Sequence, residues 1–146
     1  MKHFALLTAA ALGLGACTTE SFEARPYDIE FPINRNYQAV YAGVLEASRA
    51  CWGGQFAILS MSRVEGQLYP DLGYGVVYHG ETAMMPVHHT STKIERAGRG
   101  SIVRVKFGQP PRAGGDGGAT FRGWVEYWAA GGRACPKVGA LTAPKA

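Results

Sequence analysis

The residues best suited to chemistry in this chain are three histidines near its centre, His79, His88 and His89. Imidazole nitrogens bind zinc, but a protein zinc site needs three or four ligands at close spacing. His88 and His89 are neighbours in a segment with an extended pattern, so their side chains point to opposite faces and are poorly placed to share one ion. We therefore expect exposed polar histidines, with no metal site and no bound cofactor.

Short enzyme motifs are missing from the sequence. It contains no nucleophile elbow, no phosphate-binding loop ending in Gly-Lys-Ser/Thr, and no HExxH zinc motif. An enzyme would have to assemble its site from dispersed residues such as Ser60, His79 and Glu81. The sequence therefore predicts a non-enzymatic protein, and the alternative is a hydrolase or thiol enzyme whose site is not visible in the sequence.

Basic residues gather on a predicted hairpin in the second half of the chain. They are Lys93, Arg96, Arg99, Arg104 and Lys106. Charges beside a turn most often form a solvated face, and lysines at a sheet edge also oppose unwanted strand pairing. The functional alternative is contact with an anionic surface, such as lipid phosphates or an acidic partner.

Three tyrosines, Tyr69, Tyr74 and Tyr78, surround the turn sequence LYPDLGYG. Tyrosine rings suit a binding surface because they present an apolar body and a polar tip. Aromatic residues are also common in strands, where they pack against their neighbours. We expect packing within the sheet and keep a partner-binding surface as the functional alternative.

The N-terminus has the three parts of a secretory signal. A short basic start precedes residues 4–14, which are apolar and uncharged, and small residues stand directly before Cys17. The apolar run is shorter than the roughly 20 residues that a membrane-spanning helix needs. We therefore predict a signal peptide over residues 1–16.

The quartet Leu14-Gly15-Ala16-Cys17 resembles the lipobox of bacterial lipoproteins. In that family the cysteine thiol is acylated, the chain is cut just before the cysteine, and the new amino group is acylated as well. The resemblance implies that two or three acyl chains on Cys17 hold the protein permanently on a membrane. Thr18 stands where an Asp retains well-studied lipoproteins at the inner membrane, so the resemblance favours the periplasmic face of the outer membrane. The alternatives are an ordinary secretory signal and a buried N-terminal helix.

The remaining cysteines, Cys51 and Cys135, would enter an oxidising compartment if the chain is exported. Two cysteines in such a compartment are expected to form one disulfide. Cys51 closes one predicted helix and Cys135 follows another, so a bridge would join the ends of the two helices. The alternatives are two buried free thiols or one reactive thiol.

Composition sets broad limits on the partners. The formal net charge of +4 is mildly basic, which suits anionic lipid head groups, lipopolysaccharide or cell-wall polymers without requiring them. We expect no nucleic-acid partner for an exported protein. A length of 146 residues, less the signal, suits one domain.

Hydrophobic periodicity predicts two helices with strands between them. Helical spacing of apolar residues covers 35–51, with Asn34 or Asn36 as the N-cap, and recurs over 119–130. Alternating segments predict strands, and they are 55–63, 67–69, 74–79, 87–95 and 101–107. The second half of the tether, 27–31, also alternates and is a candidate edge strand. Turn candidates lie at Glu65-Gly66, 70–73 and 97–100. Strands joined by turns form an antiparallel meander, so we predict a two-layer α+β fold. It has an antiparallel sheet of four to five strands with two amphipathic helices on one face.

The predicted organisation has four parts. They are a lipoprotein signal peptide over 1–16, a lipidated cysteine with a flexible tether over 17–33, a globular α+β domain over 34–136, and a disordered tail over 137–146. The layout resembles small proteobacterial outer-membrane lipoproteins through the phrases NYQAVYAGVLEASRAC, LYPDLGYG and GWVEYWAAGGRACP. That resemblance implies fold and location, and no activity.

These observations predict a membrane-anchored lipoprotein that acts as a non-enzymatic binding or accessory module of the cell envelope. The expected partner is an envelope protein. The first alternative is contact with anionic lipid or lipopolysaccharide through the basic hairpin from Lys93 to Lys106, and the second is an envelope hydrolase or thiol enzyme. The sequence does not predict an oligomeric state.

Overall fold

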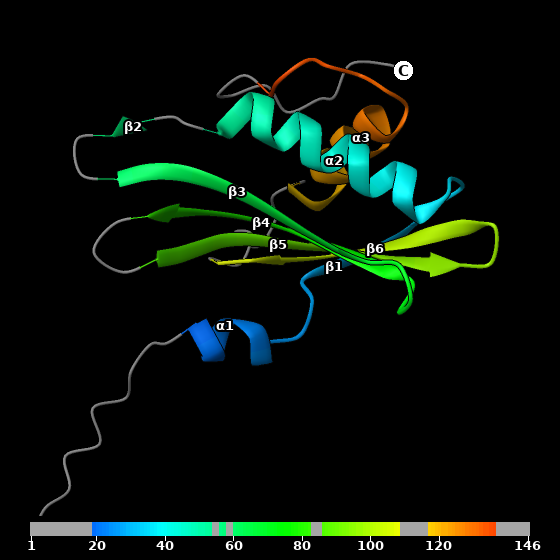
Figure 1. The fold of residues 1–146 in the computed structure, drawn as a ribbon, viewed down its shortest axis with the longest axis horizontal. Helices are drawn as coiled ribbons and strands as arrows, with labels where there is room; N and C mark the ends of the chain where they lie inside the picture. Colours follow the sequence, from blue (N-terminus) through cyan, green and yellow to red (C-terminus); the bar gives the residue numbers. More distant parts are fainter. Residues whose placement is uncertain (1–18, 54–55, 58–59, 83–85, 109–116, 137–146) are drawn as a thin grey trace, which may run out of the picture.

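A computed structural model describes residues 19–53, 56–57, 60–82, 86–108 and 117–136 (Figure 1). These residues form helices and one antiparallel sheet, so the predicted α+β class is confirmed. The strand order is β1-β6-β5-β4-β3-β2, and β2 is only two residues long. The elements are α1 (Thr19–Ala24), β1 (Ile29–Ile33), α2 (Tyr37–Trp52), β2 (Phe56–Ala57), β3 (Ser60–Tyr69), β4 (Tyr74–Thr82), β5 (Pro86–Ala97), β6 (Gly100–Phe107) and α3 (Gly117–Ala129).

Helix α2 follows the predicted apolar stripe. The Asn36 side chain accepts a hydrogen bond of 2.9 Å from the Gln38 backbone N–H, which satisfies one of the free donors at the helix start. At the other end the Gly53 N–H donates to the Arg49 carbonyl at 2.9 Å. The buried residues of the helix are Tyr37, Val40, Tyr41, Val44, Ala47, Ser48 and Cys51.

Strand β3 corrects one predicted turn. Gly66 pairs with Val77 in the middle of β3, so Glu65-Gly66 does not end a strand. A Cβ atom at Gly66 would lie 2.6 Å from the Tyr41 hydroxyl and 2.7 Å from the Leu45 methyl groups. The glycine therefore marks a place where side chains of α2 pack closely on the sheet, and no turn is required.

Two other predicted turns are confirmed. β3 and β4 are joined through residues 70–73, where the Gly73 N–H donates to the Pro70 carbonyl at 3.2 Å. β5 and β6 are joined through residues 98–99. Gly73 and Gly98 have φ angles of 73° and 58°, a region that glycine adopts without steric cost.

The segment expected to be a tether contributes two ordered elements. Residues 29–33 form β1, which pairs with β6 along its whole length, so the folded region begins before residue 34. Helix α1 buries Phe22, whose ring lies 6.0 Å from the Lys106 ammonium. One apolar side chain in a polar stretch is too weak a signal for helical periodicity, so the sequence did not predict α1.

The core lies between the sheet and α2. Helix α2 contacts β3, β4, β5 and β6, whereas α3 contacts α2 and β1. Figure 1 shows α2 and α3 above the sheet and α1 below it. Fully buried sheet residues on the α2 side include Ile94, Val103 and Val105. Residues between them in sequence, such as Lys93 and Arg104, therefore face the side on which α1 lies.

The sulfur atoms of Cys51 and Cys135 lie at disulfide-bonding distance, 2.12 Å apart. The pair connects the end of α2 to the segment that follows α3, as the sequence predicted.

The predicted signal peptide, the lipidation site Cys17 and the tail over 137–146 lie outside the described residues. Within the part of the chain described here, no helix combines the length and apolar character needed to cross a membrane.

Candidate functional site

A row of charged side chains crosses the sheet face opposite α2. Arg104 on β6 binds Glu30 on β1, with 2.5 Å between Nε and Oε2, and its guanidinium also contacts Glu95 on β5. Glu95 in turn binds the Lys93 ammonium at 2.7 Å. The row Glu30–Arg104–Glu95–Lys93 carries two charges of each sign, so it is neutral and its geometry is set by the protein itself.

Two tyrosines extend this row to the turn between β3 and β4. The Lys93 ammonium lies 4.7 Å from the centre of the Tyr74 ring, a cation–π distance. The rings of Tyr74 and Tyr69 are 4.8 Å apart, and Tyr69 is partly exposed. We call these six residues, Glu30, Lys93, Glu95, Arg104, Tyr69 and Tyr74, the charged sheet face.

Tyr78 does not share this surface. Burial raises the pKa of Tyr78 above its usual value, and the Glu23 carboxylate of α1 raises it further through its charge and a hydrogen bond. Helix α1 therefore engages Tyr78, while Tyr69 and Tyr74 remain beside the charged row. The predicted tyrosine surface is thus divided between two environments.

The predicted basic cluster is also divided by the fold. Lys93 and Arg104 belong to the neutral row, and Lys106 is buried beneath α1, where its ammonium donates to the Glu23 carbonyl. Only Arg96 and Arg99 stay at the β5–β6 turn without a carboxylate partner among the described residues. The five residues therefore do not act as one cationic patch.

His79 lies on the other face of the sheet, near the end of α2. Its Nε2 atom is 3.1 Å from the Ser62 hydroxyl, and its ring centre is 5.4 Å from that of Trp52. The His89 ring lies 6.0 Å away, and His89 pairs with Glu81 at 3.4 Å. Side chains of Ser60 and His88 lie outside the described residues.

This cluster has part of what hydrolysis requires. The Ser62–His79 contact has the length that a general base needs to take a hydroxyl proton. No carboxylate is hydrogen bonded to His79 among the described residues, so nothing there orients the imidazole as the third member of a triad would. The same residues contain no group of three or more His, Cys, Asp or Glu side chains placed to hold a metal ion.

Burial makes His79 a source of acid sensitivity. Burial lowers the pKa of His79 below its usual value, and His89 lowers it further, whereas Glu81 opposes the shift. The unfolded chain therefore binds more protons at this site, and stability is lost as the pH falls below about 6.5 toward the folded pKa. We expect the melting temperature to fall more between about pH 7.5 and pH 5 in the parent protein than in His79→Gln. If the melting temperatures of the two proteins fell equally with pH, a group other than His79 would dominate the loss of stability in acid.

Sequence reasoning missed two members of these sites, Ser62 and Glu30. Ser62 becomes a neighbour of His79 only through the register that pairs Val64 with His79. Glu30 meets Arg104 only because β1 pairs with β6, across most of the chain. Its alternating neighbours Ile29 and Phe31 were the one local signal for a strand there.

Comparisons with known proteins add no relative. No family model matches the chain, and no curated protein or solved structure matches it. The interpretation of function therefore depends on the sequence and the geometry described above.

Proposed function

We propose that the chain is a membrane-anchored lipoprotein that faces the periplasm, held at the outer membrane through Cys17, and that it acts as a non-enzymatic binding module of the cell envelope. The N-terminal signal pattern and the lipobox resemblance support the anchor. In this proposal α2 and α3 form one layer, and the partner binds the other side of the sheet.

The charged sheet face is the observation that carries the binding role. Its four charges cancel, which favours a partner that offers both signs of charge and apolar area over a uniformly anionic surface. Tyr69 and Tyr74 supply aromatic area of the kind enriched at protein interfaces. We therefore propose an envelope protein as the partner.

Site-specific photo-crosslinking in intact cells tests this surface. Gln67 is exposed and accepts a hydrogen bond from Tyr69, so a photo-crosslinking residue there should trap the partner as a discrete band. The matched control is Gln38, which is exposed on α2. Identical adducts from both positions, or none from Gln67, would contradict binding at this face.

Intact mass tests the anchor separately. Protein extracted from membranes without reductant should have the mass of residues 17–146 plus acyl chains, less two hydrogens for the Cys51–Cys135 bond. An unacylated chain would overturn the lipobox prediction, whatever the crosslinking shows.

An envelope hydrolase is the second candidate. It is favoured by one contact, the 3.1 Å separation of Ser62 Oγ and His79 Nε2. It ranks below the binding role because a nucleophile–base pair alone lacks stabilisation for the oxyanion that forms during acyl transfer.

A further inference from the structure

Three connections meet at one end of the sheet. They are residues 34–36 between β1 and α2, 70–73 between β3 and β4, and 98–99 between β5 and β6. The Arg96 N–H donates to the Gly73 carbonyl at 2.8 Å, and the Tyr37 hydroxyl donates to the Pro70 carbonyl at 3.4 Å. We call this region the turn end. Figure 1 shows it at the opposite end of the sheet from α1.

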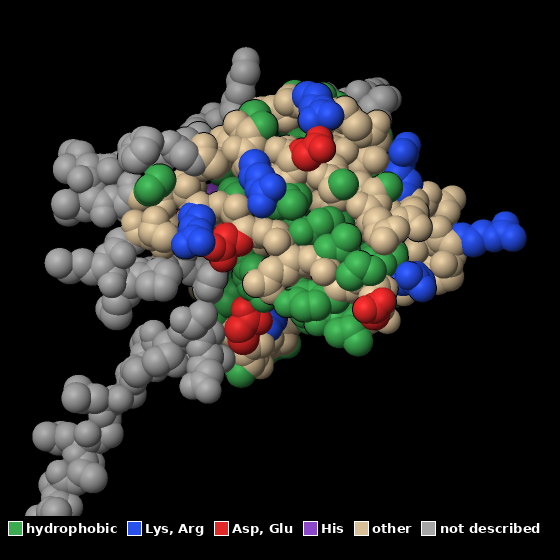
Figure 2. Space-filling model, viewed as in Figure 1, with side chains coloured by type: hydrophobic (Ala, Val, Ile, Leu, Met, Phe, Trp, Pro, Cys, Tyr) green, Lys and Arg blue, Asp and Glu red, His purple; other side chains and the backbone are tan. Residues whose placement is uncertain are grey.

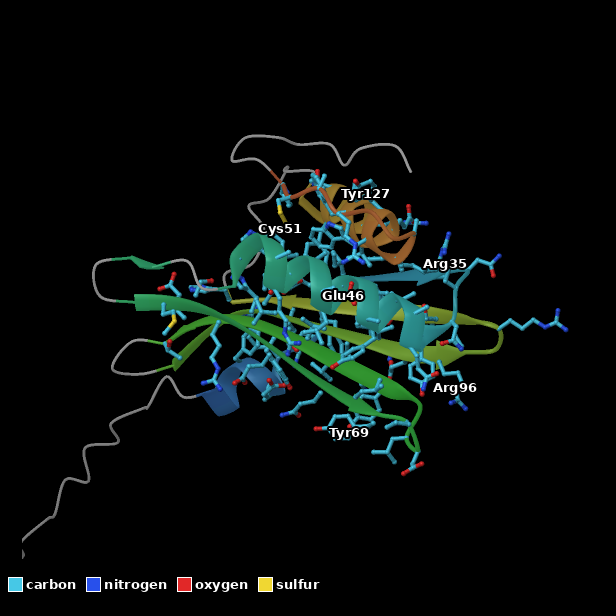
Figure 3. The ribbon with its side chains drawn as sticks, turned by 45° about the horizontal axis from the view of Figure 1, so that its top comes forward. Arg35, Glu46, Cys51, Tyr69, Arg96 and Tyr127 are labelled. Atoms are coloured by element: carbon cyan, nitrogen blue, oxygen red, sulfur yellow. A yellow bond between two sulfur atoms is a disulfide. The ribbon has the colours of Figure 1, made fainter. Side chains whose placement is uncertain are left out.

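The turn end carries three arginines that no carboxylate neutralises. Arg35, Arg96 and Arg99 form no ion pair among the described residues, whereas Arg25, Arg63, Arg104, Arg122 and Arg133 do. Arg49, near the end of α2 and away from the turn end, also has none. The Arg96 guanidinium is held over the Tyr37 ring, with its centre 5.0 Å away. Two carboxylates lie beside these arginines, Asp71 and Glu95, which line one hollow with Leu72 and Arg96. Glu95 is already paired with Lys93 and Arg104, so the formal charge of the turn end stays positive. Figure 3 shows Arg35 and Arg96 at this same end of the molecule, and Figure 2 shows basic side chains along it.

An exposed leucine stands beside these arginines. Leu72 is 69% exposed, the highest value among the large hydrophobic residues in the described ranges. Its N–H donates to the Tyr69 carbonyl at 3.2 Å, and the next residue, Gly73, closes the turn onto Pro70. The turn therefore presents Leu72 in a defined place. Its neighbours Leu68 and Tyr69 are also exposed.

We propose that the turn end docks onto an anionic phospholipid bilayer, with Leu72 entering the apolar layer and Arg35, Arg96 and Arg99 binding lipid phosphates. A projecting side chain suits a deformable bilayer, because a protein partner would have to supply a matching hollow. Phosphates complement three guanidinium groups that have no carboxylate partner, and they accept charge-assisted hydrogen bonds from such groups. This contact does not involve Cys17, because α1, the first described element after that residue, lies at the opposite end of the sheet.

The proposal also refines the anionic-surface alternative for the basic hairpin. Lys93, Arg104 and Lys106 have internal partners, so they leave the predicted contact set. Arg35, from the distant β1–α2 connection, joins Arg96 and Arg99 in their place.

A tryptophan probe at the turn end tests the contact with the bilayer in the full chain. Leu72→Trp is compared with Met61→Trp, because Met61 is 43% exposed near the opposite end of the same strand pair. Vesicles with brominated acyl chains are made from phosphatidylcholine alone or with added phosphatidylglycerol. We expect the emission of the new tryptophan at position 72 to shift to the blue and to be quenched only by the anionic vesicles. The tryptophan at position 61 should not respond.

Charge variants in the Leu72→Trp background complete the test. Arg35→Gln with Arg99→Gln should weaken binding about 25-fold, since each basic residue near an anionic surface contributes roughly fivefold. Arg49→Gln with Arg133→Gln, at positions away from the turn end, should leave it unchanged. At about 1 M salt, where the screening length is roughly 3 Å, the blue shift and the quenching of the tryptophan at position 72 should disappear.

The opposite results are equally specific. Quenching at position 72 by neutral vesicles, equal quenching at positions 61 and 72, or no response of position 72 to anionic vesicles would overturn the proposal. An unacylated Cys17 would not overturn it, because the fluorescence of the tryptophan at position 72 reports the turn end and does not require lipid on Cys17.

Discussion

Replacing Cys51 and Cys135 together by alanine is expected to lower the melting temperature of the oxidised protein by roughly 10–20 °C. The pair closes a loop with a sequence separation of 84 residues. For a loop of this length the chain-entropy model gives about 4–5 kcal/mol of stabilisation, because the bond removes extended states from the unfolded ensemble. That is a large share of the roughly 5–15 kcal/mol that keeps a domain folded.

Reductant supplies the control for this prediction. The parent protein with reductant should melt at the same temperature as the double-alanine variant, and reductant should not change the variant. The measurement is thermal unfolding followed by circular dichroism. If the variant and the oxidised parent melt together, the two sulfurs do not form a stabilising bond.

Helices α2 and α3 and the turns at 70–73 and 97–100 could be predicted because their signals are local. Helix α2 has an apolar stripe at helical spacing and an Asn36 cap, and both lie within the helix or beside it. Gly73 and Gly98 mark turns through their own backbone conformation. Gly66 was misinterpreted because its reason is tertiary, the approach of Tyr41 and Leu45 from α2.

The surfaces could be predicted only in part, because charge alone does not show which residues have partners. Lys106 is hydrophilic and was expected on a charged hairpin, yet it is buried by the backbone carbonyl of Glu23 and by the rings of Phe22 and Tyr27. Arg35 was not connected with Arg99, since only the pairing of Ile33 with Ser101 brings their two segments together. Pairing between strands far apart in the sequence therefore determines which residues form the charged sheet face and the turn end.

Trp128→Ala is expected to destabilise the protein by about 3–5 kcal/mol, the usual range for removing a buried tryptophan. Trp128 is the largest fully buried side chain in the described residues, at 1% exposure. Its ring lies 5.6 Å from that of Trp124 and 5.5 Å from that of Trp52, so it joins α3 to the end of α2. The missing ring would leave a cavity between the two helices that the Cys51–Cys135 connection keeps from collapsing freely.

Trp128→Phe separates packing from hydrogen bonding. The Trp128 N–H donates to the Ala134 carbonyl at 3.1 Å, and Ala134 is exposed, so water can replace that donor. Phenylalanine keeps most of the apolar ring, and we expect it to cost less than half as much as alanine. Urea unfolding followed by circular dichroism measures both variants. A loss of only about 0.5 kcal/mol for Trp128→Ala, the usual range of surface substitutions, would mean that α3 is not packed on α2. The two-layer arrangement that leaves the charged sheet face available would then lose its support.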